Sequence, residues 1–262
     1  MYNFNYHKPQ SLADAAKLGA GEEAKFLAGG MTLIPTLKQR LAKPSDLVDL
    51  AKIGELKGIK RDGNAVVVGA MTRHVEVATS DLVKAIPALA HLADGIGDPQ
   101  VRNRGTIGGS IANNDPAADY PSAVLALGAT VVTNKRKIAA DDFFTGMFET
   151  ALAPDEIVTA VSFPIPEKAG YSKFPNPASR YAIVGVFVAK TAGGVRVAVT
   201  GAAPCVFRQK DMEAALSKSF TPDAVAAIKQ SASGLNSDIH ASAEYRAHLV
   251  TVMAKRAVAA AG

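Results

Sequence analysis

The chain has 262 residues, of which 48% are hydrophobic and 20% are charged, as is ordinary for a globular protein of one large or two modest domains. Its net charge of +5 comes from scattered Lys and Arg residues, which argues against a nucleic-acid binder. No apolar run is long enough to span a bilayer, and the first residues show no signal peptide. We therefore expect a cytoplasmic protein.

The first two thirds of the chain alternate short apolar runs with helical patterns, which predicts α/β or α+β architecture. Helices are expected at residues 11–18, 32–43, 73–80, 82–93 and 116–127, and strands at 25–28, 47–50, 65–69, 130–133, 137–139 and 157–163. Residues 95–115 form a long polar stretch that contains several glycines, and we expect a loop there.

Five prolines and glycines cluster between residues 164 and 177, and we expect a linker that ends the first domain there. The last third has a different pattern. Strands are predicted at 182–189 and 195–199 with a turn at Gly193-Gly194, followed by helices at 210–217, 222–231 and 242–261. This pattern indicates a small antiparallel sheet with a group of helices.

The residues that carry chemistry are few. Cys205 is the only cysteine, which excludes a disulfide and an all-cysteine iron–sulfur or zinc site within the chain. The five histidines show no metal-ligand spacing, and no catalytic triad or carboxylate pair is evident. We therefore predict no metal site and no catalytic residue, and any redox chemistry must come from an organic cofactor.

Two glycine-rich segments indicate a ligand site. The first runs from Leu27 to Leu33 and contains Gly29-Gly30, and the second runs from Arg104 to Asp115 and contains Gly108-Gly109. Glycine lets the backbone approach a ligand, and exposed N–H groups in such turns bind phosphate oxygens. Neither segment is a GxGxxG motif or a P-loop. Alone, they support only a nucleotide binder that grips a pyrophosphate from two sides.

The whole chain resembles the FAD-binding medium subunit of molybdenum hydroxylases, the group of carbon monoxide dehydrogenase, xanthine dehydrogenase and aldehyde oxidoreductase. The run Arg-Asn-Arg-Gly-Thr-Ile-Gly-Gly at residues 102–109 is the most specific part of this resemblance. Further segments match in order: residues 4–9, 28–32, 47–50, 68–72, 116–119, 142–146, 201–204 and 242–246.

The resemblance implies a fold and a cofactor. Residues 1–175 should form a two-part FAD-binding domain of the vanillyl-alcohol-oxidase (PCMH) type, and residues 176–262 a small C-terminal domain of antiparallel sheet and helices. It also implies FAD in this chain, [2Fe-2S] clusters in a small partner subunit and a molybdenum cofactor in a large one. The expected assembly is a heterotrimer or a dimer of heterotrimers.

The resemblance also implies the residues that hold FAD. The pyrophosphate and ribityl chain should contact both glycine segments, Leu33 should pack near the isoalloxazine, and Asp119 should accept hydrogen bonds from FAD hydroxyls. Lys173 should lie near the ring, and Tyr171 is a candidate to cover one face of it. The full set is Leu27, Ala28, Gly29, Gly30, Met31, Thr32, Leu33, Thr106, Gly108, Gly109, Ser110, Asn113, Asp115, Asp119, Tyr171 and Lys173.

Two positions depart from the family pattern. Met31 stands where relatives often carry His or Ser, so only its backbone N–H can serve as a donor. Ser110 replaces a frequent Asn but keeps a hydroxyl.

The function implied is an electron relay, in which FAD accepts electrons from the iron–sulfur partner and passes them to a terminal acceptor. Two alternatives remain: a stand-alone FAD-dependent oxidase or reductase, and a non-catalytic nucleotide-binding or scaffold protein. Both the primary substrate of the complex and the terminal acceptor (NAD, quinone, oxygen or another carrier) remain open.

Overall fold

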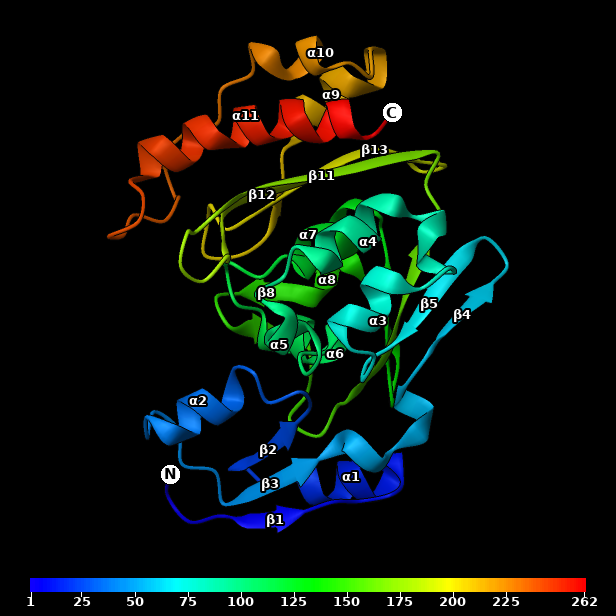
Figure 1. The fold of residues 1–262 in the computed structure, drawn as a ribbon, viewed down its shortest axis with the longest axis vertical. Helices are drawn as coiled ribbons and strands as arrows, with labels where there is room; N and C mark the ends of the chain where they lie inside the picture. The colour runs from blue at the N-terminus through cyan, green and yellow to red at the C-terminus, as the bar shows by residue number, and fades with distance from the viewer.

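The computed structural model describes all residues, 1–262, and it consists of three parts stacked along the long axis (Figure 1). A small parallel sheet near the N-terminus lies at one end, and an antiparallel sheet with its helices lies in the middle. A second antiparallel sheet, covered by the C-terminal helices, lies at the other end. The predicted two-part domain followed by a sheet-and-helix domain is confirmed.

The N-terminal part is a parallel sheet of order β1-β3-β2. Its elements are β1 (Asn5–His7), α1 (Leu12–Gly19), β2 (Ala24–Leu27), α2 (Leu33–Lys38) and β3 (Asp46–Asp49). The Ser11 hydroxyl caps α1 by accepting the Asp14 N–H at 3.1 Å, as its sequence position predicts. The helix predicted to reach residue 43 ends at Lys38, because Arg40 takes a left-handed conformation with φ +61°.

The central part is an antiparallel sheet of order β4-β5-β10-β6-β7. The strands are β4 (Ile59–Asp62), β5 (Ala65–Gly69), β6 (Thr130–Thr133), β7 (Lys137–Ala139) and β10 (Val158–Pro164). Val66 and Val68 of β5 are fully buried, which places one face of this strand in the core. A hairpin, β8 (Phe144–Gly146) with β9 (Glu149–Thr150), stands apart from this sheet.

The central sheet shares one large core with several helices. These are α3 (His74–Thr79), α4 (Pro87–Asp94), α6 (Ile107–Asn113), α7 (Tyr120–Ala126) and α8 (Ala140–Phe143); α5 (Pro99–Arg102) and the 3₁₀ turns Leu50–Lys52, Gly54–Leu56 and Val83–Ala85 complete the region. The stretch predicted as a loop over 95–115 therefore contains α5 and α6. α5 has only four residues, and α6 has seven with Gly108-Gly109 near its start, so hydrophobic periodicity reveals neither.

The C-terminal part is a sheet of order β11-β12-β13-β14 packed against three helices. Its elements are β11 (Lys168–Pro175), β12 (Ala182–Thr191), β13 (Gly194–Thr200), β14 (Phe207–Arg208), α9 (Lys210–Lys218), α10 (Pro222–Ala226) and α11 (Ala243–Ala260). Phe187 of β12 joins the central core, whereas Val186 and Val188 join the core beneath α11. A strand covered on both faces reads as a continuous apolar run, as β12 does.

The segment predicted to be a linker is a strand. β11 pairs with β12 from Lys168 onward, so the second sheet begins before the predicted boundary at residue 175. The prolines misled the prediction because they lie at the two ends of β11, not inside it. No helix of the structure is both long and apolar enough to cross a membrane.

Gly170 tests how α11 packs on the second sheet. An added Cβ at this position would overlap the Ala257 carbonyl oxygen of α11. We expect Gly170→Ala to lower the free energy of unfolding by about 1–3 kcal/mol, because overpacking forces the helix away from the sheet. Urea unfolding measures this loss. Gly193→Ala, whose nearest neighbour is Thr191 Oγ1 at 3.6 Å, is the matched control and should stay near the unaltered value. Equal stability of the two variants would contradict the packing described.

Candidate functional site

The first glycine loop connects β2 to α2 by a sharp turn. Gly30 has φ +77°, a left-handed conformation that favours glycine. The backbone N–H groups from Gly29 to Leu33 donate no hydrogen bond to any other backbone group, and the first one used in this region is that of Ile34, to the Gly30 carbonyl. Successive free N–H groups in a turn form a concave anion-binding surface. The loop therefore offers five adjacent backbone donors to a phosphate.

The second glycine loop leads into α6 and is held by hydrogen bonds to the segment that follows β5. Thr106 caps α6 by accepting the Gly109 N–H at 3.2 Å on its hydroxyl. The Ile107 N–H donates to the Thr72 carbonyl at 3.1 Å, and the Gly108 N–H donates to the Ala70 carbonyl at 2.8 Å. These N–H groups position the loop and are not free for a ligand, unlike those of the first loop.

The two loops lie against each other, although they are far apart in sequence. An added Cβ on Gly29 would overlap the carbonyl oxygen of Arg104, and one on Gly109 would lie 3.3 Å from the Ala28 Cβ. An added Cβ on Gly108 would lie 2.5 Å from the Ala70 Cβ. Only glycine allows this backbone-to-backbone contact. We call the two loops together the cradle, in which the first loop carries the free N–H groups and the second leads into the start of α6.

The remaining residues of the two loops lie around this cradle. Met31 is exposed and Thr32 is exposed beside it, while Leu27, Ala28 and Leu33 are half-buried. Ser110 and Asn113 of α6 are half-buried as well. The side chains predicted to contact a ligand from these two loops are thus accessible, with the exception of the buried Thr106.

Asn114, which the sequence reading missed, holds the end of α6. It has φ +43° and is 1% exposed. Its amide Nδ2 donates to the carbonyls of Gly146 and Glu149, each at 2.8 Å, so it ties the β8–β9 hairpin to α6. Asparagine tolerates a left-handed helix end, which was the one available signal. The next residue, Asp115, accepts the Ala117 N–H at 2.8 Å, and burial raises the pKa of its carboxyl group.

Asp119, Tyr171 and Lys173 form a buried cluster. Asp119 Oδ1 accepts from the Tyr171 hydroxyl at 2.5 Å and lies 2.9 Å from Lys173 Nζ, which also donates to the Gly95 carbonyl at 2.9 Å. Tyr171 is 4% exposed and its ring lies in the central core, so it is not placed to cover a flavin face. Asp119 is also buried. Burial raises the pKa of its carboxyl group, and Lys173 opposes that rise.

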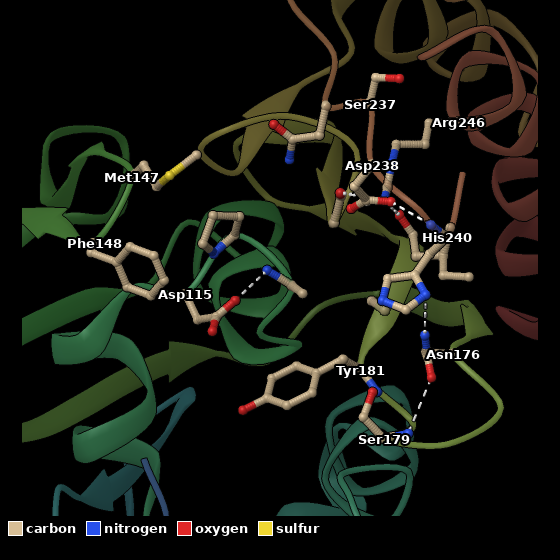
Figure 2. A pocket seen from close by; sticks show the side chains of 16 residues that line it. Asp115, Met147, Phe148, Asn176, Ser179, Tyr181, Ser237, Asp238, His240 and Arg246 are labelled. Atoms are coloured by element: carbon tan, nitrogen blue, oxygen red, sulfur yellow. Dashed lines mark hydrogen bonds and ion pairs between the residues drawn. The ribbon is translucent and has the colours of Figure 1, made fainter. Parts of the chain in front are cut away.

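Tyr181, which the sequence reading also missed, projects beside the cradle. It is 43% exposed, and burial of its hydroxyl together with the nearby Asp115 raises its pKa, whereas the Thr32 side chain opposes this rise. Asn176 shapes the turn before it: the Asn176 N–H donates to the Tyr181 carbonyl at 2.8 Å. Tyr181 and Asp115 also line an open cavity of about 510 Å³ (Figure 2).

The fold and the paired loops define a flavin-binding component of an oxidoreductase. The chain matches the FAD binding domain in molybdopterin dehydrogenase over residues 2–166 and the CO dehydrogenase flavoprotein C-terminal domain over residues 169–261. It therefore belongs to the family of FAD-binding medium subunits of molybdenum hydroxylases. The two matches meet where β11 begins.

Relatives share nearly the full length of the chain. It is 37% identical to the carbon monoxide dehydrogenase medium chain of Hydrogenophaga pseudoflava, over 98% of this chain and 96% of the relative. It is 38% identical to the nicotine 6-hydroxylase medium subunit of Paenarthrobacter nicotinovorans, with the same coverage. In the reconstituted CO dehydrogenase from Oligotropha carboxidovorans, a chain of 36% identity superposes with a TM-score of 0.92, covering 99% of this chain and 97% of that one.

The donor set of the cradle fits FAD. A dinucleotide carries a pyrophosphate, and the free N–H groups of Gly29 to Leu33 are neutral donors suited to its oxygens. The two loops touch through their backbones, because Gly29 lies directly against the Arg104 carbonyl. No side chain fits between the loops at this point. No group of three or more His, Cys, Asp or Glu side chains is arranged to hold a metal ion.

Gly29 tests the contact between the loops. We expect Gly29→Ala to weaken FAD binding at least tenfold, because the new methyl group must displace the Arg104 carbonyl and so misplace the free N–H groups. Titration of FAD followed by flavin fluorescence measures the affinity. Gly21→Ala is the control, since its Cβ would lie in ordinary contact, 3.8 Å from the Ala24 Cβ. Unchanged FAD affinity in a folded Gly29→Ala protein would refute the role of this contact.

The Asp119–Lys173 pair gives a pH-dependent prediction. Lys173→Met should lower the free energy of unfolding by about 3–5 kcal/mol at neutral pH, because it leaves a buried carboxylate without its partner. Removing Lys173 raises the folded-state pKa of Asp119 further, so the penalty grows as pH rises above the ordinary carboxyl range. It shrinks below that range, where Asp119 holds its proton in both states.

Urea unfolding across pH measures this effect. The double variant Asp119→Asn with Lys173→Met removes both charges and should recover most of the loss. If Lys173→Met lost as much stability in acid as at neutral pH, the pair would not be the cause.

Proposed function

We propose that the chain is the flavin-bearing relay of a molybdenum hydroxylase complex. In this role it receives electrons from [2Fe-2S] clusters of a small subunit, after a large subunit has oxidised the primary substrate at its molybdenum cofactor. The terminal acceptor is then reduced at this chain. The observation that carries the proposal is the row of free backbone donors from Gly29 to Leu33, set against the second glycine loop in a chain of this family.

The chain's own residues bind and orient the cofactor. The N–H groups of the first loop would hold the pyrophosphate, the hydroxyls of Thr32 and Ser110 would add hydrogen bonds, and Leu33 would pack beside the ring. Asn113 and Asp115 would border the ribityl chain. When bound, FAD supplies the ability to take up electrons one at a time and release them in pairs.

We assign the buried cluster of Asp119, Tyr171 and Lys173 a structural role. Lys173 is 9% exposed at its side chain and bridges Asp119 to the Gly95 carbonyl, so it connects the second sheet to the end of α4. This geometry favours a structural role for Asp119, Tyr171 and Lys173 over a direct contact with FAD hydroxyls. None of the three is proposed to exchange protons with the primary substrate.

The names of the relatives support a partner arrangement. Both carbon monoxide dehydrogenase and nicotine 6-hydroxylase chains are described as medium chains or subunits, which implies larger and smaller partners. We extend this arrangement to the present chain as a heterotrimer or a dimer of heterotrimers. In this arrangement the chain acts after substrate oxidation.

A variant of the second loop separates relay from catalysis. An added Cβ on Gly109 would lie 3.0 Å from Thr106 Oγ1, so we expect the larger Gly109→Val to expel FAD from the assembled complex. Reduction of the partner subunits by substrate should continue, while electron delivery to the terminal acceptor stops. Acid release of flavin and bleaching of the iron–sulfur absorbance measure the two steps.

Gly54→Val, in open space, is the matched control and should keep its flavin. If the intact Gly109→Val complex also lost substrate-driven bleaching, the relay role would be wrong. An unaltered complex that stayed colourless in excess FAD would refute flavin binding itself.

A further inference from the structure

A short segment joins Asp115, the last residue of the second glycine loop, to Asp119. Its residues, Pro116 to Ala118, belong to no helix or strand, so no regular element of their own fixes their carbonyl groups. Both ends bear on the site, because Asp115 is proposed to border the ribityl chain and Asp119 is paired with Lys173. The arrangement of this segment therefore decides where the two carboxyl groups lie.

Main-chain N–H groups of the C-terminal sheet hold two carbonyl groups of this segment. The Ala182 N–H donates to the Ala117 carbonyl at 3.3 Å, and the Gly201 N–H donates to the Pro116 carbonyl at 2.8 Å. These donors lie at the start of β12 and directly after the end of β13. Two neighbouring strands thus hold a segment that is far away in sequence.

Thr200, the last residue of β13, adds a side-chain donor to the same segment. Its hydroxyl oxygen lies 2.6 Å from the Ala118 carbonyl oxygen and 3.1 Å from the Pro116 carbonyl oxygen. A hydroxyl has one proton to donate, and the shorter distance assigns it to Ala118. Thr200 is 1% exposed, so loss of its hydroxyl would leave a carbonyl partner without this bond in a region that bulk water does not reach.

The strand ends that carry these donors are themselves fixed. Arg246 of α11 is 4% exposed and donates from Nη1 to the carbonyls of Ile183 at 2.6 Å and Gly201 at 3.0 Å. Gly201 has φ +81°, and an added Cβ there would overlap the Ala182 carbonyl oxygen. The ends of β12 and β13 therefore keep one spacing, and Thr200 meets the segment in one arrangement.

The position of the segment sets the direction of the Asp115 carboxyl group. The Ala117 N–H donates to Asp115 Oδ1 at 2.8 Å, and a dashed line from Asp115 in Figure 2 marks this bond. The Pro116 carbonyl and the Ala117 N–H belong to one planar peptide unit. The groups that hold the Pro116 carbonyl therefore also fix the direction of the N–H that holds Asp115.

We propose that Thr200 is a positioning residue for the flavin site: together with the N–H groups of Ala182 and Gly201, its hydroxyl holds residues 116–118 so that Asp115 is directed at bound FAD. This proposal rests on the proposed function, which places the ribityl chain beside Asp115. Thr200 is buried and acts on the cofactor only through the segment. The C-terminal sheet thereby sets the geometry of the cofactor site as well as covering it.

Thr200→Ala removes the hydroxyl and leaves the backbone donors in place. In the assembled complex we expect it to weaken FAD binding about tenfold, because a small misplacement of a binding group is costly, and we expect Thr200→Ser to stay within about twofold of the unaltered complex. Titration of FAD into the flavin-free complex, followed by flavin fluorescence, measures the affinity. At saturating FAD, the visible spectrum of the bound flavin should change in Thr200→Ala and return in Thr200→Ser.

Thr133 of β6 supplies the matched control. Its hydroxyl oxygen is likewise bonded in a buried setting, 3.0 Å from the Arg136 carbonyl oxygen and 2.7 Å from Glu156 Oε1. Urea unfolding should show a loss of stability in both alanine variants, whereas FAD affinity should fall only in Thr200→Ala. Thr200→Cys keeps a weaker S–H donor and should give an intermediate affinity, so it tests the role if Thr200→Ala does not assemble.

Equal FAD affinity in the unaltered, Thr200→Ala and Thr200→Cys complexes would overturn the positioning role. An equal loss of affinity in Thr133→Ala would also overturn it, because general destabilisation would then account for the effect. Either result leaves the relay function standing. An unaltered complex that takes up no FAD would instead count against the proposed function.

Discussion

The contact between Gly29 and the Arg104 carbonyl is the constraint on which the site depends. It presses the first loop against the second, so that the free N–H groups face the start of α6. Two further close contacts hold the second loop in place: Gly105 lies under the buried His74 ring, and Gly108 lies on Ala70. Each of these contacts excludes any side chain. The N-terminal sheet and the central sheet are therefore joined at backbone level where the cofactor is proposed to bind.

The second sheet is packed on both faces, and this packing positions its residues beside the site. Its inner face contributes Tyr171 and Phe187 to the central core, and its outer face packs beneath α11. This burial lets Lys173 reach Gly95 and Asp119 from β11. A buried ion pair stabilises a particular arrangement more than it adds net stability. The C-terminal part is thus a support for the flavin-binding part and the source of the Tyr181 turn.

The elements and the two glycine loops were predictable from sequence because valine runs, caps and glycine pairs are local signals. The contacts that decide the site were not. Whether an N–H in the second loop is free depends on Ala70 and Thr72, which lie far away in sequence. Tyr171 lies within β11 and Tyr181 directly precedes β12, and only the packed sheet shows that the first is in the core and the second is 43% exposed. Prolines near the ends of β11 likewise predicted a linker where the structure has a strand.

The proposed binding by backbone groups requires no polar side chain at Met31. The donors that the structure offers at Gly29 to Leu33 are main-chain N–H groups. A main-chain donor survives any change of side chain that preserves the turn, and the turn depends on Gly29, which abuts the Arg104 carbonyl, and on Gly30, which has φ +77°. The Met31 side chain is exposed, so a substitution there leaves the main-chain donors in place. Adaptation of the site to a particular complex therefore depends on exposed residues such as Met31 and Tyr181.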